Sequence, residues 1–337
     1  MMRGRIVLLS CFLIVLITAS TYWFRATDSD GHHQSLSSLL APLSSSCCST
    51  STDESPNLVS IDKFPIDKKV AVIIETRPLL TLLPLILHFA SVLGPEWPIL
   101  FFTRPSVVST LAAFGHGSQP FKRMVHSGQI KIIELPTEPD LGEYLGLSNF
   151  LASEWFWSQM GSAEYMLNFQ SDSILCANSG RKVEDFFEYD FVGAYHPWVE
   201  GAYNGGLSLR NVAMARRVIE LYDISDDVDA GSQDGLYEDV WFCNKMKAMD
   251  AHFPSEQTAS EFAIDMIYSE RPLGIHGLNR QNREQQEAKK KELYAWCPEA
   301  ALADKSTEVL ELNEDEKKSL RLAKDRKTKG GKRLPFG

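Results

Sequence analysis

The sequence predicts an α/β domain with a mostly parallel sheet flanked by helices. Two observations predict it: runs of β-branched apolar residues recur along the chain, and stretches of helical periodicity separate them. The first run, residues 70–75 (Val-Ala-Val-Ile-Ile-Glu), is apolar at successive positions, as expected of a strand buried on both faces. Residues 79–93 then have the pattern of a helix that ends at Gly94.

The alternation continues along the chain. We expect further strands at residues 98–102, 130–135 and 165–169, and further helices at 105–114 and 142–160. The order strand-helix-strand-helix-strand implies a mostly parallel sheet covered by helices. In such sheets, ligands bind at the carboxyl ends of the strands.

The N-terminus predicts a membrane anchor. Residues 6–24 carry no charge, and at roughly 1.5 Å per residue they are just long enough to cross a hydrocarbon core of about 30 Å. Arg3 and Arg5 precede this run, which favours a cytosolic tail at residues 1–5 and a lumenal remainder. We therefore expect one transmembrane helix, the signal anchor of a single-pass type II membrane protein. A cleaved signal peptide is the alternative, because Thr18-Ala19-Ser20 is an acceptable cleavage site.

Composition divides the rest of the chain into three parts. Residues 25–60 are rich in Ser and Thr without periodicity, which is typical of a flexible stem. Residues 61–300 hold the predicted α/β domain. Residues 301–337 are dense in charged side chains, so we expect a disordered, solvated tail.

Charge and cysteine content exclude two classes of protein. A formal net charge of −10 argues against nucleic-acid binding, which needs a clustered basic face. Six cysteines in a chain of this size do not form a disulfide scaffold, and they show no metal-binding spacing. In an oxidising lumen, Cys176, Cys243 and Cys297 either include one bridge or remain buried thiols.

The first candidate site follows the strand at 165–169, where the chain reads Gln170-Ser171-Asp172-Ser173. In nucleotide-sugar transferases, carboxylates of an Asp-x-Asp motif at such a position hold a divalent cation against the donor diphosphate. Here only Asp172 is acidic, and Asp172 and Ser173 are also ordinary turn formers. Glu75-Thr76-Arg77 lies at the end of the first strand. It either binds a nucleotide base or ribose or forms a structural ion pair.

The second candidate is Asn204-Gly205-Gly206. Two glycines allow positive φ and a close backbone approach to a ligand, as a sugar or acceptor pocket requires, although such a pair is also common in turns.

The third and fourth candidates are Glu238-Asp239 and His276. The two carboxylates begin a predicted helix, where the helix dipole favours them, and either is placed to act as a catalytic base. His276 ends a short apolar strand and is either structural or a ligand for a metal or a phosphate.

The order of these motifs adds a resemblance. Val-Ile-Ile-Glu-Thr-Arg, Leu-Asn-Phe-Gln-Ser-Asp-Ser, Asn-Gly-Gly-Leu-Ser-Leu-Arg, Glu-Asp-Val-Trp-Phe and Gly-Ile-His-Gly follow one another between Lys69 and Leu278. This set resembles DUF5672, a mostly fungal family of unknown function that is regarded as glycosyltransferase-like. The glycine and Glu-Asp-Val motifs are also similar to those of Golgi β-1,3-galactosyltransferase-like enzymes with the GT-A fold, which is Rossmann-like.

The resemblance implies roles for the candidates. Asp172 stands at the metal and diphosphate position with His276 as a further metal ligand, and Asp239 or Glu238 is the base. The donor nucleotide meets residues Glu75, Arg77, Gln170, Asp172 and Ser173, and the acceptor meets Asn204, Gly205 and Gly206.

We therefore expect a glycosyltransferase of the hexosyltransferase type in the Golgi or endoplasmic reticulum. It would use a nucleotide-sugar donor, a glycan, glycoprotein or glycolipid acceptor, and a divalent cation, with Mn²⁺ favoured by oxygen ligands and one imidazole. The rival is a catalytically silent lumenal glycan-binding or assembly module with the same fold. A nucleotidyltransferase would normally have a Gly-rich basic phosphate loop after its first strand, where this chain has Glu75-Thr76-Arg77-Pro78.

Overall fold

The computed structural model describes residues 66–115, 118–136, 141, 143–278, 283–304, 308–310 and 318. Contacts divide the chain into Met1–Ser55 and Pro56–Gly337, and every described residue belongs to the second unit. The predicted anchor at 6–24 and the stem at 25–60 lie outside the described residues. None of the helices in the described part of the chain has the length and apolarity that a membrane crossing requires.

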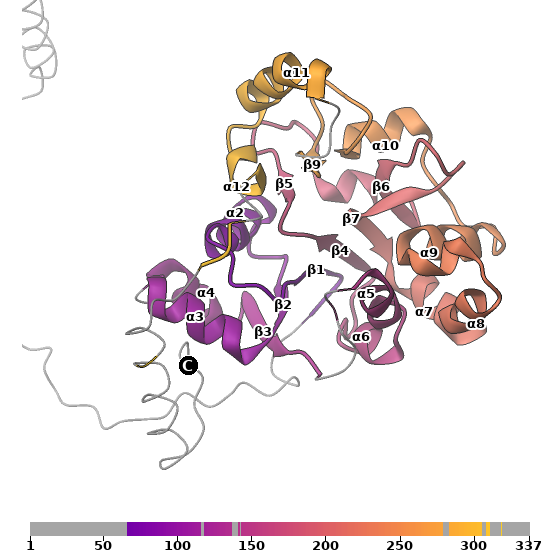
Figure 1. The fold of residues 1–337 in the computed structure, drawn as a ribbon, viewed down its shortest axis with the longest axis horizontal. Coiled ribbons are helices and arrows are strands. Elements are labelled where there is room, and N and C mark those ends of the chain that lie inside the picture. The colour runs from indigo at the N-terminus through magenta and orange to yellow at the C-terminus, as the bar shows by residue number, and fades with distance from the viewer. Residues whose placement is uncertain are drawn as a thin grey trace, which may run out of the picture. The chain divides into compact units, whose positions relative to one another are not determined.

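A six-stranded sheet forms the centre of the domain, with strand order β3-β2-β1-β4-β7-β6 (Figure 1). Its strands are β1 (Lys69–Ile74), β2 (Ile99–Thr103), β3 (Ile130–Glu134), β4 (Tyr165–Phe169), β6 (Phe191–Tyr195) and β7 (Tyr203–Asn211). The pairs among β1, β2, β3 and β4 are parallel, whereas β7 runs antiparallel to both of its neighbours. The prediction of a mixed α/β domain with a mostly parallel sheet is confirmed.

Both faces of the sheet are buried, as the apolar runs predicted. In β1, Ala71 and Ile73 pack into one core cluster, while Val70 and Val72 pack into the other. Burying a Val or Ile side chain contributes roughly 1.5–3 kcal/mol, so each strand stabilises two layers at once.

Helices cover the two faces of the sheet (Figure 1). The longer helices are α2 (Leu82–Leu93), α3 (Pro105–Gly115), α4 (Gln119–Ser127), α5 (Tyr144–Leu151), α7 (Val212–Leu221), α9 (Glu238–Lys247) and α11 (Arg283–Trp296). The shorter ones are α6 (Glu154–Ser158), α8 (Ile224–Asp229), α10 (Glu256–Phe262), α12 (Ala300–Asp304) and the 3₁₀ turns η3 (Val183–Phe186) and η4 (Gln233–Leu236).

The helix predicted at 142–160 is wrong as a single element, because it divides into α5 and α6. Ser153 causes the break: its Oγ accepts a hydrogen bond from the backbone N–H of Phe156 at 3.2 Å and donates one to the carbonyl of Phe150 at 2.7 Å. A serine with extended backbone at this point caps a new helix.

The order of the parallel strands reverses at β1. The chain moves outward from β1 to β2 and β3, then returns to place β4 on the other side of β1. The carboxyl ends of β1 and β4 therefore lie side by side. In open α/β sheets, ligands bind in the crevice at such a reversal.

A smaller sheet adjoins this edge, with strand order β5-β9-β8. Its strands are β5 (Ser173–Leu175), β8 (Ala263–Ile264) and β9 (Gly274–His276). The antiparallel register of β5 and β9 places Ser173 opposite His276. Two candidate residues that are about a hundred positions apart in sequence thus become neighbours.

The C-terminal region is fastened to the domain at two places. Cys176, which follows β5, forms a disulfide with Cys297, which follows α11, whereas Cys243 is a buried free thiol. The described structure also continues past residue 300, the predicted end of the domain, because α12 extends to Asp304 and Val309 pairs with Leu79.

We predict that this disulfide stabilises the domain. Its loop spans 121 residues of sequence, and cross-links of this kind contribute about 2–5 kcal/mol by constraining the unfolded chain. Cys297→Ser should lower the free energy of unfolding by that amount and make it insensitive to reductant, as measured by denaturant titration with and without dithiothreitol. Cys243→Ala is the control: it should keep the response to reductant, and a Cys297→Ser variant that keeps it would contradict the assignment.

Candidate functional site

The turn from β4 to β5 is fastened to the first residues of β7. The backbone N–H of Gln170 and the hydroxyl of Ser173 both donate to the carbonyl oxygen of Gly206, each at 2.8 Å. The two glycines therefore lie inside a strand, and their interpretation as a turn is wrong. Asp172 does lie in a turn, as its residue type suggested.

His276 is the centre of a group of polar side chains at this turn. Its ring is buried, and Nε2 lies 3.4 Å from Oδ1 of Asp172 and 3.2 Å from Oε1 of Gln170. On the other side of the ring, Nδ1 lies 3.5 Å from Oδ2 of Asp265. Burial by itself would lower the pKa of His276, but Asp172 and Asp265 outweigh it and raise the pKa to about 9.

Glycine is required where β7 meets this group. A Cβ at Gly206 would lie 2.1 Å from Nε2 of His276 and 2.7 Å from Oε1 of Gln170. Both distances are far shorter than a van der Waals contact, so only glycine allows the backbone of β7 and the imidazole to approach this closely.

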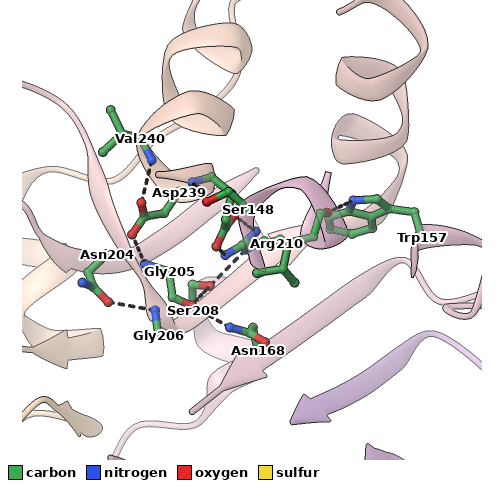
Figure 2. A network of polar contacts seen from close by, with 12 residues as sticks. Ser148, Trp157, Asn168, Asn204, Gly205, Gly206, Ser208, Arg210, Asp239 and Val240 are labelled. Atoms are coloured by element: carbon green, nitrogen blue, oxygen red, sulfur yellow. Dashed lines mark hydrogen bonds and ion pairs between the residues drawn. The ribbon is translucent and has the colours of Figure 1, made fainter. Parts of the chain in front are cut away.

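Gly205 connects the same strand to α9 (Figure 2). Its backbone N–H donates to Oδ2 of Asp239 at 2.7 Å, and the N–H of Val240 donates to Oδ1 of Asp239 at 2.9 Å. On the other side, the carbonyl of Gly205 accepts from the side chain of Asn168 at 2.8 Å. Asp239 is partly exposed, and each of its oxygens retains a lone pair for a further hydrogen bond.

Glu238 has a different environment from its neighbour. Both of its oxygens bind the guanidinium of Arg210, at 2.6 and 2.9 Å, and the Arg210 side chain is wholly buried. The hydroxyl of Ser208 accepts from Nε of Arg210 at 3.0 Å. A carboxylate held in this way serves the fold, because removing either partner would leave a buried charge uncompensated.

Glu75 and Arg77 lie at the end of β1, beside the turn that carries Asp172. Two hydrogen bonds of 2.9 Å join the Arg77 guanidinium to the buried Glu75 carboxylate, so the predicted ion pair is present. The same guanidinium donates to Oγ of Ser171 at 3.3 Å. Half of the Arg77 side chain is exposed, which leaves it accessible to a ligand.

The candidates named from the sequence thus adjoin one another along the carboxyl edge of the main sheet. Gln170, Ser173 and His276 meet at Gly206, and Asp172 meets His276. Asp239 meets the adjoining Gly205. The backbone N–H of Gly206 also donates to Oδ1 of Asn204 at 2.8 Å (Figure 2). The structure assigns these residues no role in catalysis or binding, and their roles remain predictions.

Some residues of the site, Asp265, Ser148 and Asn168 among them, were not singled out from the sequence. Asp265 follows β8 in the segment Ala-Ile-Asp, and His276 ends the similar segment Gly-Ile-His. In both, a polar side chain directly follows a short apolar strand, and this similarity could have indicated Asp265. Ser148, whose hydroxyl accepts from the N–H of Glu238 at 3.2 Å, and Asn168 gave no signal, because an isolated Ser in a helix and an isolated Asn in a strand are common.

The residues around His276 fit a divalent cation only as a partial ligand set. Among the described residues, no group of three or more His, Cys, Asp or Glu is placed to hold a metal. The carboxylate of Asp172 and the amide oxygen of Gln170 nevertheless converge on Nε2 of His276, and two hard oxygen donors with one imidazole suit Mn²⁺. Asp265 faces the other ring nitrogen, where the imidazole ligands of metals commonly have a carboxylate.

Comparison with known families gives one match. Residues 129–276 match the family described as "Protein of unknown function (DUF5672)". This match is narrower than the region from Lys69 to Leu278 over which the ordered motifs resemble that family, and it leaves out β1 with Glu75 and Arg77. No curated protein matches the chain.

Similar solved structures include two of the glycosyltransferase GlyE of Streptococcus pneumoniae TIGR4. The apo form is 12% identical over 70% of this chain and 62% of its own, with a TM-score of 0.36. The other is 11% identical over 71% and 63%, with a TM-score of 0.39, so the chain spans about three fifths of GlyE. Core-mannan synthase A of Aspergillus fumigatus in its Mn/GDP form is 10% identical over 59% of this chain and 76% of its own, with a TM-score of 0.31.

We predict that Gly206→Ala disrupts the site. The added methyl group must displace the buried His276 ring or the backbone of β7, and overpacking of this kind costs about 1–3 kcal/mol. Denaturant titration should show that loss. Gly180→Ala is the matched control, since a Cβ at Gly180 meets no atom within 4 Å and should change stability by less than about 0.5 kcal/mol. Equal stability of the two variants would contradict the packing described at His276.

Proposed function

We propose that this chain is a glycosyltransferase that moves a sugar from a nucleotide-sugar donor to an acceptor hydroxyl. One observation carries the proposal: the cluster around Asp172 and His276 and the partly exposed carboxylate of Asp239 are attached to adjacent glycines of one strand. Glycosyl transfer to a hydroxyl needs a group that binds the donor diphosphate and a base for the acceptor, and these two clusters supply candidates for both.

The donor end of the proposed site lies where the strand order reverses. Arg77 presents a half-exposed guanidinium there, suited to a phosphate or a ribose. Asp172, His276 and Gln170 would hold the cation, which when bound would neutralise charge on the diphosphate leaving group. An imidazole can accept a cation only through an unprotonated nitrogen, so binding would displace the proton at Nε2 of His276.

Asp239 is the better candidate for the base. Two backbone N–H groups fix its carboxylate, so neutral donors position it directly. Glu238 has both oxygens bound to Arg210 and has no oxygen free of that pair for an acceptor proton. The acceptor hydroxyl would approach Asp239 along Asn204 and Gly205.

The proposed location is the lumen of the Golgi or endoplasmic reticulum, with the segment at 6–24 as a type II anchor. The Cys176–Cys297 disulfide supports it, because structural disulfides form and persist in oxidising compartments.

The first test is donor binding by the full chain, purified in a mild detergent. We expect one of a panel of UDP-, GDP- and dTDP-sugars to raise the melting temperature in the presence of Mn²⁺, and Asp172→Ala to abolish this shift. Asp229→Ala removes the same charge from an exposed position and should keep it. If no nucleotide stabilises the wild type, the proposal fails. The remaining interpretation is then a catalytically silent glycan-binding or assembly module.

The second test separates the two carboxylates. Asp239→Asn should retain donor binding but lower turnover about 10²–10⁴-fold, the usual contribution of a general base. Glu238→Gln should instead lower stability, because it leaves the buried Arg210 uncompensated, and breaking such a pair costs about 3–5 kcal/mol. The measurements are nucleotide release and denaturant titration, and a folded Glu238→Gln enzyme without turnover would move the base to Glu238.

A further inference from the structure

An exposed group of apolar side chains lies beside the proposed base. Ten large hydrophobic side chains among the described residues are exposed, and four of them are at Tyr144, Leu145, Leu236 and Tyr237. They come from two segments that are about ninety residues apart in sequence. Exposed apolar side chains that gather in one place point to a binding surface more than singly scattered ones do.

Ser148 holds the two segments together. Its buried hydroxyl donates to the carbonyl of Leu236 at 2.8 Å and accepts from the N–H of Glu238 at 3.2 Å. These bonds join the first turns of α5 to the start of α9, where Asp239 directly follows Glu238 (Figure 2). Ser148 therefore fixes the position of this surface relative to the carboxylate of Asp239, in the first turn of α9.

Tyr144 and Tyr237 form a pair on this surface. Their ring centroids are 5.8 Å apart at 63°, an edge-to-face contact that leaves ring faces uncovered. The side chains remain 74% and 48% exposed despite the contact, so the pair does not belong to the core. Tyr237 directly precedes Glu238 and Asp239.

We propose that this tyrosine pair binds a pyranose ring of the acceptor, so that the acceptor of the reaction is itself a sugar. A sugar ring has one face of polarised C–H groups, which the negative face of an aromatic ring attracts, and an edge of hydroxyls that the phenol groups can bind. The inference rests on the proposed function, because it takes Asp239 as the base toward which the acceptor hydroxyl is directed.

The size of the surface favours a sugar over a protein partner. A stable protein interface buries roughly 800 Å² on each side, and a whole aromatic side chain supplies only about 150–250 Å². Two partly exposed tyrosines and two leucines that are each 37% exposed fall short of that area. They match the face of one or two sugar rings.

The test uses saturation-transfer NMR of the full chain with methyl glycosides of glucose, galactose, mannose and N-acetylglucosamine, without nucleotide. We expect at least one glycoside to bind, and Tyr144→Ala and Tyr237→Ala each to weaken it about tenfold. Tyr237→Phe keeps the ring but removes one phenol hydroxyl, so it should weaken binding less than Tyr237→Ala does. Leu221→Ala, at an exposed site on α7, is the control for a lost apolar side chain.

Two results would overturn the inference: no glycoside binds the wild type, or a glycoside binds the wild type and both alanine variants equally. Melting temperatures of the variants check that they fold, and each tyrosine is tested alone. Because nucleotide is absent, this result does not depend on donor binding. Glycoside binding through the tyrosines without any donor binding would support the surface and refute the transferase.

Discussion

The close approach of β7 to the β4–β5 turn is the constraint on which the rest of the site depends. At Gly206 the carbonyl accepts two hydrogen bonds from that turn, and at Gly205 the N–H holds the carboxylate of Asp239. The absence of a Cβ at Gly206 leaves the space that the imidazole of His276 occupies. One short backbone segment thus sets the separation between the proposed donor end and the proposed acceptor end.

The buried ion pair of Arg210 and Glu238 holds this segment of β7 against α9. Desolvating two charges is costly, and a buried pair often stabilises a protein no more than an apolar one would. Here the arginine makes two bonds to Glu238 and lies 4.7 Å from the ring centre of Phe191, so its charge is well compensated. The pair fixes the start of α9 against β7. It thereby also positions Asp239, which directly follows Glu238.

The sequence predicted individual strands and helices better than the contacts that join them. The run from Val70 and the helix end at Gly94 were readable because burial and chain reversal leave local patterns. The break at Ser153 was missed, since the aromatic pattern runs on through it. Ser148 and Asp265 matter through partners about ninety and eleven residues away, and no local pattern encodes such contacts. Most of the candidates that were found stood at a strand end or a helix start, whereas Gly205 and Gly206, inside β7, were found by their residue type.

The small sheet shows how strand register can build a polar centre. The parallel pairs Ala263 with Gly274 and Ile264 with Ile275 continue to Asp265 and His276, so the carboxylate comes beside the imidazole. Antiparallel pairing with β5 brings the turn of Asp172 to the other ring nitrogen. A shift of β9 by one residue relative to its neighbours would move the ring of His276 to the opposite face of the small sheet.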